Sequence, residues 1–185
     1  WGVNFLFHSP LFSCADESRS SLRFIGNGQN NDYQAEQNRE IVALGEKMIF
    51  SFIEYHINDF TDRKMFSFVN LDINVGDAKL ASYYKEKQNF WVEKMSRFPL
   101  ALSASDDSSY VSPASFKGIS EEMTKEGYEN PAFLDAVFSL LSTNHKDSLP
   151  AKKELLFWSD RFREWYGEEN AEHFYGINDI INVIK

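Results

Sequence analysis

A long stretch with helical periodicity, residues 34–58, restricts the possible folds of this chain more than any other feature. Apolar side chains recur there at steps of three and four residues, the spacing that aligns them along one side of an α-helix. This stripe consists of Ile41, Leu44, Met48, Phe52 and Tyr55, and it is widened by Val42, Ile49 and Ile53. The pattern predicts an amphipathic helix that packs on another element, and Gly45 would let that element approach closely.

Three stretches predict strands of a small sheet under this helix. Residues 65–73 (MFSFVNLDI) would place apolar side chains on both faces of an extended chain, which is typical of an interior strand. Residues 2–7 and 22–25 are rich in β-forming residues and predict two further short strands. A second amphipathic helix, predicted over residues 78–96, would cover the same sheet. Its apolar register is formed by Leu80, Tyr84, Trp91 and Met95.

The second half of the chain predicts one hairpin and then helices. Residues 98–102 and 110–116 flank a polar run and predict a hairpin, with Pro113 placing the second arm at an edge. Apolar spacing and capping residues then predict three helices. The first is expected to begin at Pro131 with Asn130 as its N-cap, the second after Pro150, and the third after Asn178 as its cap.

We therefore predict an α+β fold, in which a small mixed or antiparallel sheet is packed by amphipathic helices and followed by a helical C-terminal half. Two regions are expected: an α+β domain over residues 1–105 and a mainly helical region over residues 106–185. The arm at residues 110–116 is compatible with membership of either region.

The composition limits the class of protein. Hydrophobic residues make up 43% of the 185, enough for a buried core. A net charge of -9 argues against nucleic acid or an anionic membrane as a partner, because such surfaces need basic patches. No apolar run is long enough to span a membrane.

One cysteine, Cys14, cannot form an internal disulfide, which favours a reducing, cytoplasmic location. Because the chain begins at Trp1 and ends in a predicted helix, we expect it to be a fragment of a longer protein.

Two arginines precede a glycine-rich turn at residues 26–28 and are the candidates for binding an anion. Arg19 and Arg23 carry planar guanidinium groups, which suit bidentate contact with a phosphate. The simpler alternative is that they pair at the surface with Asp16 and Glu17. The glycines do not complete a dinucleotide-binding motif, so the turn itself is expected to be structural.

No other motif predicts a complete catalytic or metal site. The four histidines do not share metal-ligand spacing, so no metal site is expected. A nucleophilic Cys14 with His8 would make a small cysteine hydrolase, but a buried thiol is the favoured interpretation. The adjacent carboxylates Asp106-Asp107 and Glu121-Glu122 point apart or into solvent, which disfavours a two-carboxylate hydrolase. We expect the isolated chain to have no enzymatic activity.

A late aromatic stripe has two interpretations. Leu155, Trp158, Phe162 and Trp165 would share one face of a helix. Core packing is favoured, and the alternative is an exposed interaction face formed by Trp158, Phe162 and Trp165.

Several motifs along the chain together resemble one known family. An apolar strand at residues 3–7 leads to the helix NREIVALGEKMIFSFI, and a tryptophan helix leads to FPLALSASDDSSYVSPASF. The segment LLFWSDRFREW lies near the end. The single matching residues are Phe12, Arg19, Leu22, Asn38 and Trp91. This arrangement resembles the segment that follows the nucleotide domain in bacterial GHKL ATPases, especially those similar to sacsin and the heat-shock chaperone. Neither the ATP-binding asparagine helix nor the glycine lid of that family is present.

The resemblance implies that this chain is a non-catalytic, transducer-like or middle region of a larger chaperone-like ATPase. It would couple nucleotide state to conformation or partner binding. Arg19, with Arg23 second, would contact the phosphate of a nucleotide held by the N-terminal nucleotide-binding domain of the same protein. ATP and Mg would belong to the parent protein and no cofactor to this chain alone, and a homodimer is compatible with the family. Two alternatives stand beside this function: a protein-interaction module with an aromatic helix face, and the small cysteine hydrolase.

Overall fold

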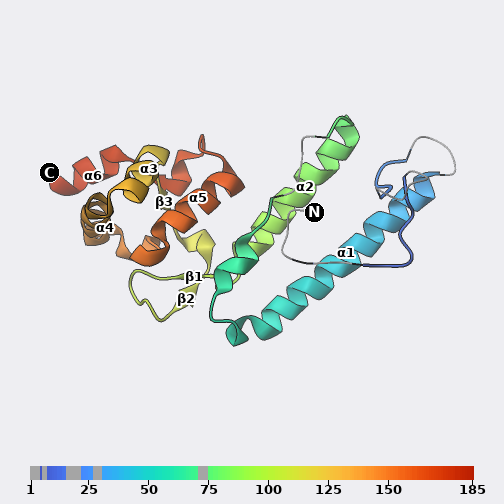
Figure 1. The fold of residues 1–185 in the computed structure, drawn as a ribbon, viewed down its shortest axis with the longest axis horizontal. Coiled ribbons are helices and arrows are strands. Elements are labelled where there is room, and N and C mark those ends of the chain that lie inside the picture. Colours follow the sequence, from blue (N-terminus) through green and yellow to red (C-terminus); the bar gives the residue numbers. More distant parts are fainter. Residues whose placement is uncertain (1–4, 6–7, 16–21, 27–30, 71–74) are drawn as a thin grey trace. The chain divides into compact units, whose positions relative to one another are not determined.

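The computed structural model describes residues 5, 8–15, 22–26, 31–70 and 75–185 (Figure 1). Within these residues the fold is α+β, as predicted, with α-helices, short 3-10 helices and two small sheets. The α-helices are α1 (Asn31–His56), α2 (Ala78–Met95), α3 (Glu121–Glu129), α4 (Pro131–His145), α5 (Leu155–Tyr166) and α6 (Ile177–Ile184). The strands are β1 (Ala101–Leu102), β2 (Tyr110–Val111), β3 (Gly118–Ile119) and β4 (Phe174–Tyr175).

The chain forms two compact units. The first unit comprises Trp1–Thr61 and Leu71–Gln88, and the second comprises Asp62–Asn70 and Asn89–Lys185. Helix α2 therefore begins in one unit and ends in the other. This division differs from the predicted one near residue 106, because the hairpin of β1 and β2 is bonded to the C-terminal helices and belongs with them.

The predicted interior strand over residues 65–73 is wrong at its beginning, and its described remainder contains only a single β-bridge residue, Val69. Residues Arg63–Ser67 form a 3-10 helix, and residues 71–73 lie outside the described part. The Asp62 carboxylate accepts a hydrogen bond from the Lys64 N–H at 3.2 Å, and the Ser67 hydroxyl donates to the Lys64 carbonyl at 2.7 Å. Such local bonds compete with an extended backbone, and they close a helical turn here despite the apolar alternation.

Of the two other predicted strands, the one at residues 22–25 is not found as a strand, and the one at residues 2–7 lies outside the described residues except for Phe5. At residues 22–25 the structure shows only an isolated antiparallel bridge between Leu22 and Cys14. Of residues 2–7, only Phe5 is described, and it has no regular structure. The sheet expected under α1 is therefore not formed by the described residues.

The predicted hairpin of the second unit is confirmed but is shorter than expected. Strands β1 and β2 pair antiparallel, with Leu102 opposite Tyr110. Pro113 does not extend the second arm and instead begins a 3-10 helix, Pro113–Ser115. A second sheet, absent from the prediction, joins β3 and β4 in parallel. At Gly118 in β3, a Cβ atom would lie 2.8 Å from the Ser159 Cα of α5, so only glycine allows this approach.

Local capping signals placed the ends of the C-terminal helices well. The Asn130 side chain accepts a hydrogen bond from the Phe133 N–H at 3.2 Å, and Pro131 is the first residue of α4. Gly167 ends α5 with a φ of 79°, a conformation that favours glycine. The last helix is the exception, because it begins at Ile177 and Asn178 is not its cap. The Asp179 carboxylate accepts the Gly176 N–H there at 2.7 Å.

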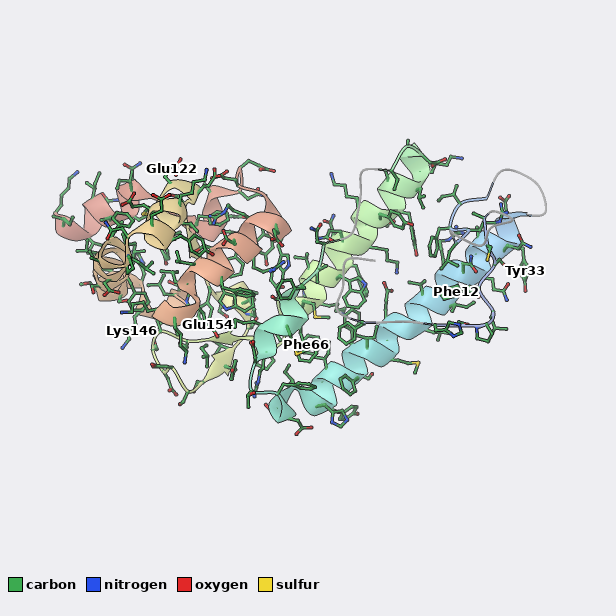
Figure 2. All side chains as sticks on the ribbon, viewed as in Figure 1. Phe12, Tyr33, Phe66, Glu122, Lys146 and Glu154 are labelled. Carbon is green, nitrogen blue, oxygen red and sulfur yellow. The ribbon has the colours of Figure 1, made fainter. Side chains whose placement is uncertain are left out.

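An apolar cluster in the second unit joins α3, α4, α5 and α6 with the sheet of β3 and β4. A buried carboxylate, Glu154, lies just before α5 and is 3% exposed (Figure 2). One of its oxygens accepts hydrogen bonds from the Leu102 N–H and the Trp158 Nε1–H, each at 3.0 Å. Lys64 Nζ lies 3.5 Å from the other oxygen. The apolar cluster of this unit consists of Ile119, Met123, Val137, Leu141, Leu149, Leu155, Tyr175 and Ile180.

Candidate interaction surface

The side of α1 that packs within the first unit is selected by polar contacts as much as by apolar ones. Asn38 is fully buried, and its amide bonds the Ser13 N–H, the Ser13 carbonyl and the Arg23 carbonyl at 2.6–2.8 Å. Glu46 is 5% exposed and accepts a hydrogen bond from Lys87 Nζ of α2 at 2.6 Å. A buried polar group without such partners would cost about 1–3 kcal/mol. The helix is therefore held with this side inward.

The opposite side of α1 is apolar and open to solvent. The exposed fraction is 60% for Leu44, 70% for Met48, 46% for Phe52 and 80% for Tyr55. We refer to these four residues as the α1 apolar face. The sequence predicted that they would pack inside, and the structure corrects this. The helix carries two apolar stripes, and it buries the one with Val42 and Ile53, which continues the side of Asn38 and Glu46.

The α1 apolar face has a shallow depression and a polar margin. Its depression is lined by Lys47, Met48, Ser51, Phe52, Tyr55 and His56. The Phe52 ring lies against His56 and Phe60, with ring centroids 5.0 Å and 6.3 Å apart. His56 Nδ1 in turn lies 3.0 Å from an Asp59 carboxylate oxygen. These contacts support the end of the face while leaving its centre open.

An exposed stripe of this kind has a physical consequence. Covering one large apolar side chain contributes roughly 1.5–3 kcal/mol, and contiguous apolar surface on a soluble protein commonly marks an interaction site. In the sequence this surface is visible only as one of the two apolar stripes of residues 34–58. Periodicity alone could not tell which stripe is buried, because both have helical spacing.

Of the two candidate arginines, the structure describes one. Arg19 lies outside the described residues, as do Asp16 and Glu17. Arg23 Nη2 donates to the Cys14 and Ala15 carbonyls at 3.4 and 3.3 Å, and its Nε is buried without a hydrogen-bond partner. In the described part of the chain, the Arg23 guanidinium thus contacts backbone carbonyls and no carboxylate.

The predicted aromatic stripe on α5 belongs to the core. Trp158 and Phe162 are fully buried and Trp165 is 7% exposed. The Trp158 ring packs against the other two, with centroids 5.7 and 6.0 Å apart. These three residues therefore do not form an exposed interaction face, whereas the four apolar residues of the α1 apolar face are exposed.

The remaining candidates do not assemble into a catalytic group within the described residues. His8 is exposed, and Cys14 is partly buried and bridges to Leu22. No cluster of histidine, cysteine, aspartate or glutamate suited to a metal ion occurs among the described residues.

One carboxylate pair does form, and it differs from the sequence-adjacent pairs Asp106-Asp107 and Glu121-Glu122. Glu121 contacts Glu168, which is distant in sequence, and their cleft also contains Arg163. The pKa of Glu121 is lowered, mainly by its hydrogen bond with Lys125 and then by the one with Glu168. The pKa of Glu168 is raised, by desolvation and then by that bond to Glu121. Glu121 also pairs with Lys125, whose Nζ lies 2.5 Å from a Glu121 carboxylate oxygen, so these residues form a surface ion-pair network.

The chain was compared with protein-family models, with curated proteins and with solved structures, and none of them matches it. Among the described residues, none of the helices combines the length and apolar character that crossing a membrane requires.

Proposed function

We propose that this chain is an interaction region of a larger protein, and that the α1 apolar face is its docking surface. The observation that carries this proposal is the exposure of Leu44, Met48, Phe52 and Tyr55 on a helix whose other side is already packed. The occupant we propose is an apolar helix face from another polypeptide. Residues spaced in this way along a helix interdigitate with a second helix better than with an irregular segment.

A site-specific cross-link tests the docking surface. Met48 would be replaced by the photoreactive p-benzoylphenylalanine in the full-length protein, and Lys85, which is exposed on α2, would carry the same probe as a control. We expect a cross-link from position 48, to a peptide with helical apolar spacing, that is lost when Leu44→Glu is added. Equal labelling from both positions, or none from position 48, would overturn the proposal.

A second, narrower candidate is that the larger protein is an ATPase resembling the GHKL family, with this chain as its transducer-like region. The supporting observation is Arg23, whose guanidinium donates to backbone carbonyls and forms no ion pair with a described carboxylate. Such a group retains the capacity to bind an anion such as a phosphate. Arg19 stays the first candidate of the family resemblance.

A further inference from the structure

We propose that the helix which covers the α1 apolar face is α1 of a second copy of this chain, packed antiparallel. This inference rests on the proposed docking function and names its partner. Two observations lead to it. A row of exposed residues on α1, called the seam below, has the spacing of a helix-pairing surface, and it is flanked on one side only by the exposed Lys47 and Glu54, seven residues apart.

The seam follows the spacing of a two-stranded helical coil. Leu44, Met48, Ser51 and Tyr55 are separated by steps of four, three and four residues, and all four are exposed. They lie on the side of α1 opposite to the buried Glu46 and Ile53. These are therefore the core positions that a partner helix would meet.

An antiparallel pair with two-fold symmetry makes this seam self-complementary. In that arrangement Leu44 faces the partner subunit's Tyr55, and Met48 faces the partner subunit's Ser51. Two large apolar side chains thus meet at each end of the seam, and a large side chain meets a small one at each of its two middle positions. Because the interface is isologous, every contact occurs twice.

The flanking charges select the antiparallel direction. Lys47 and Glu54 both occupy the position just before a seam residue, and among the described residues neither forms an ion pair. Antiparallel packing brings Lys47 beside the partner subunit's Glu54, and it does so at two symmetric places. Parallel packing would bring Lys47 beside the partner subunit's Phe52 and leave the carboxylate unpaired. Opposite charges at these positions specify orientation more than they add affinity.

The extent of the seam sets the strength of association. Four seam positions per copy bury less than the roughly 1,200 Å² that stable, specific interfaces reach. The net charge of -9 on each copy opposes association as well. We therefore expect a weak dimer that forms as the protein concentration rises.

Reciprocal charge reversal tests the pairing. Sedimentation equilibrium over a range of concentrations would compare the wild-type chain with Lys47→Glu, Glu54→Lys and the double variant. Each single reversal turns two attractive contacts into two repulsive ones and should weaken dimerisation about tenfold. The double variant restores opposite charges at both places and should recover wild-type affinity. Lys85→Glu, a matched reversal on α2, should leave it unchanged, and circular dichroism would verify that every variant is folded.

Failure of this inference is distinguishable from failure of the docking proposal. A wild-type chain that stays monomeric, or a double variant no better than the single ones, would overturn the antiparallel pair. The cross-link at position 48 then decides whether the docking surface remains, because a product of twice the mass of the full-length protein reports self-association. A product of another mass would retain the docking surface with a different occupant and reject the second copy.

Discussion

At the scale of single residues, Glu154 connects three separate segments of the second unit. Its carboxylate contacts the backbone of β1, the Trp158 indole of α5 and the Lys64 ammonium of the 3-10 helix Arg63–Ser67. A buried carboxylate is costly unless its oxygens are all engaged. Here both are, so the group determines how three separate segments meet.

Glu154→Ala should destabilise the protein strongly. The change leaves the Leu102 N–H and the Trp158 indole N–H buried without an acceptor, and Lys64 without its anion. Breaking a buried pair from one side typically costs about 3–5 kcal/mol. Urea unfolding of the purified chain measures the free energy of unfolding. The matched control is Glu129→Ala, which changes an exposed glutamate of α3 and should stay within about 0.5 kcal/mol of wild type. Equal midpoints for the two variants would contradict this account of Glu154.

At the scale of elements, α1 shows how a helix with two apolar stripes chooses its buried side. Ile53 is fully buried on the side that carries Asn38 and Glu46, whereas Met48 is 70% exposed. Both are large apolar residues in the same helix. The difference between them is therefore the packing of the helix and not its propensity.

Alanine substitution at these two positions tests the orientation of α1. Ile53→Ala removes a fully buried side chain and should lower the free energy of unfolding by about 2–5 kcal/mol. Met48→Ala removes an exposed one, and its effect should stay within about 0.5 kcal/mol. Thermal and urea unfolding at high dilution would measure both without any contribution from association. The reverse order would mean that α1 buries the other stripe.

At the scale of the whole molecule, the chain has two compact units joined through α2 and a net charge of -9. The second unit carries the denser polar and aromatic core around Glu154 and Trp158. The first carries the α1 apolar face and Arg23. Both candidate functions, docking and phosphate contact, thus assign their residues to the first unit.

The transducer-like hypothesis makes its own prediction for the full-length protein. Arg19→Ala should lower ATP turnover by the equivalent of about 2–4 kcal/mol, as expected when one transition-state donor is lost. Nucleotide binding should suffer less, and the melting temperature should stay near that of wild type. Arg97→Ala, which removes an arginine paired at the surface with Glu93, is the matched control and should keep full turnover. Wild-type turnover in Arg19→Ala would reject this role.

The sequence by itself determined the features that depend on neighbours along the chain. Helices α1 and α2, the cap at Asn130, the end of α5 at Gly167 and the hairpin turn all follow from spacing and capping within a few residues. Burial of the Trp158 stripe also followed, because a strongly aromatic helix face in a chain of this size is most often core.

Only the tertiary structure decided which side of α1 faces inward and that β3 pairs with β4. Each of these depends on groups that are distant in sequence. Asn38 needs Ser13 and Arg23, and Glu46 needs Lys87, before the inner side of α1 is defined. Apolar periodicity indicates that a helix face can be buried. The residues that bury it are distant in sequence and come together only in the folded chain.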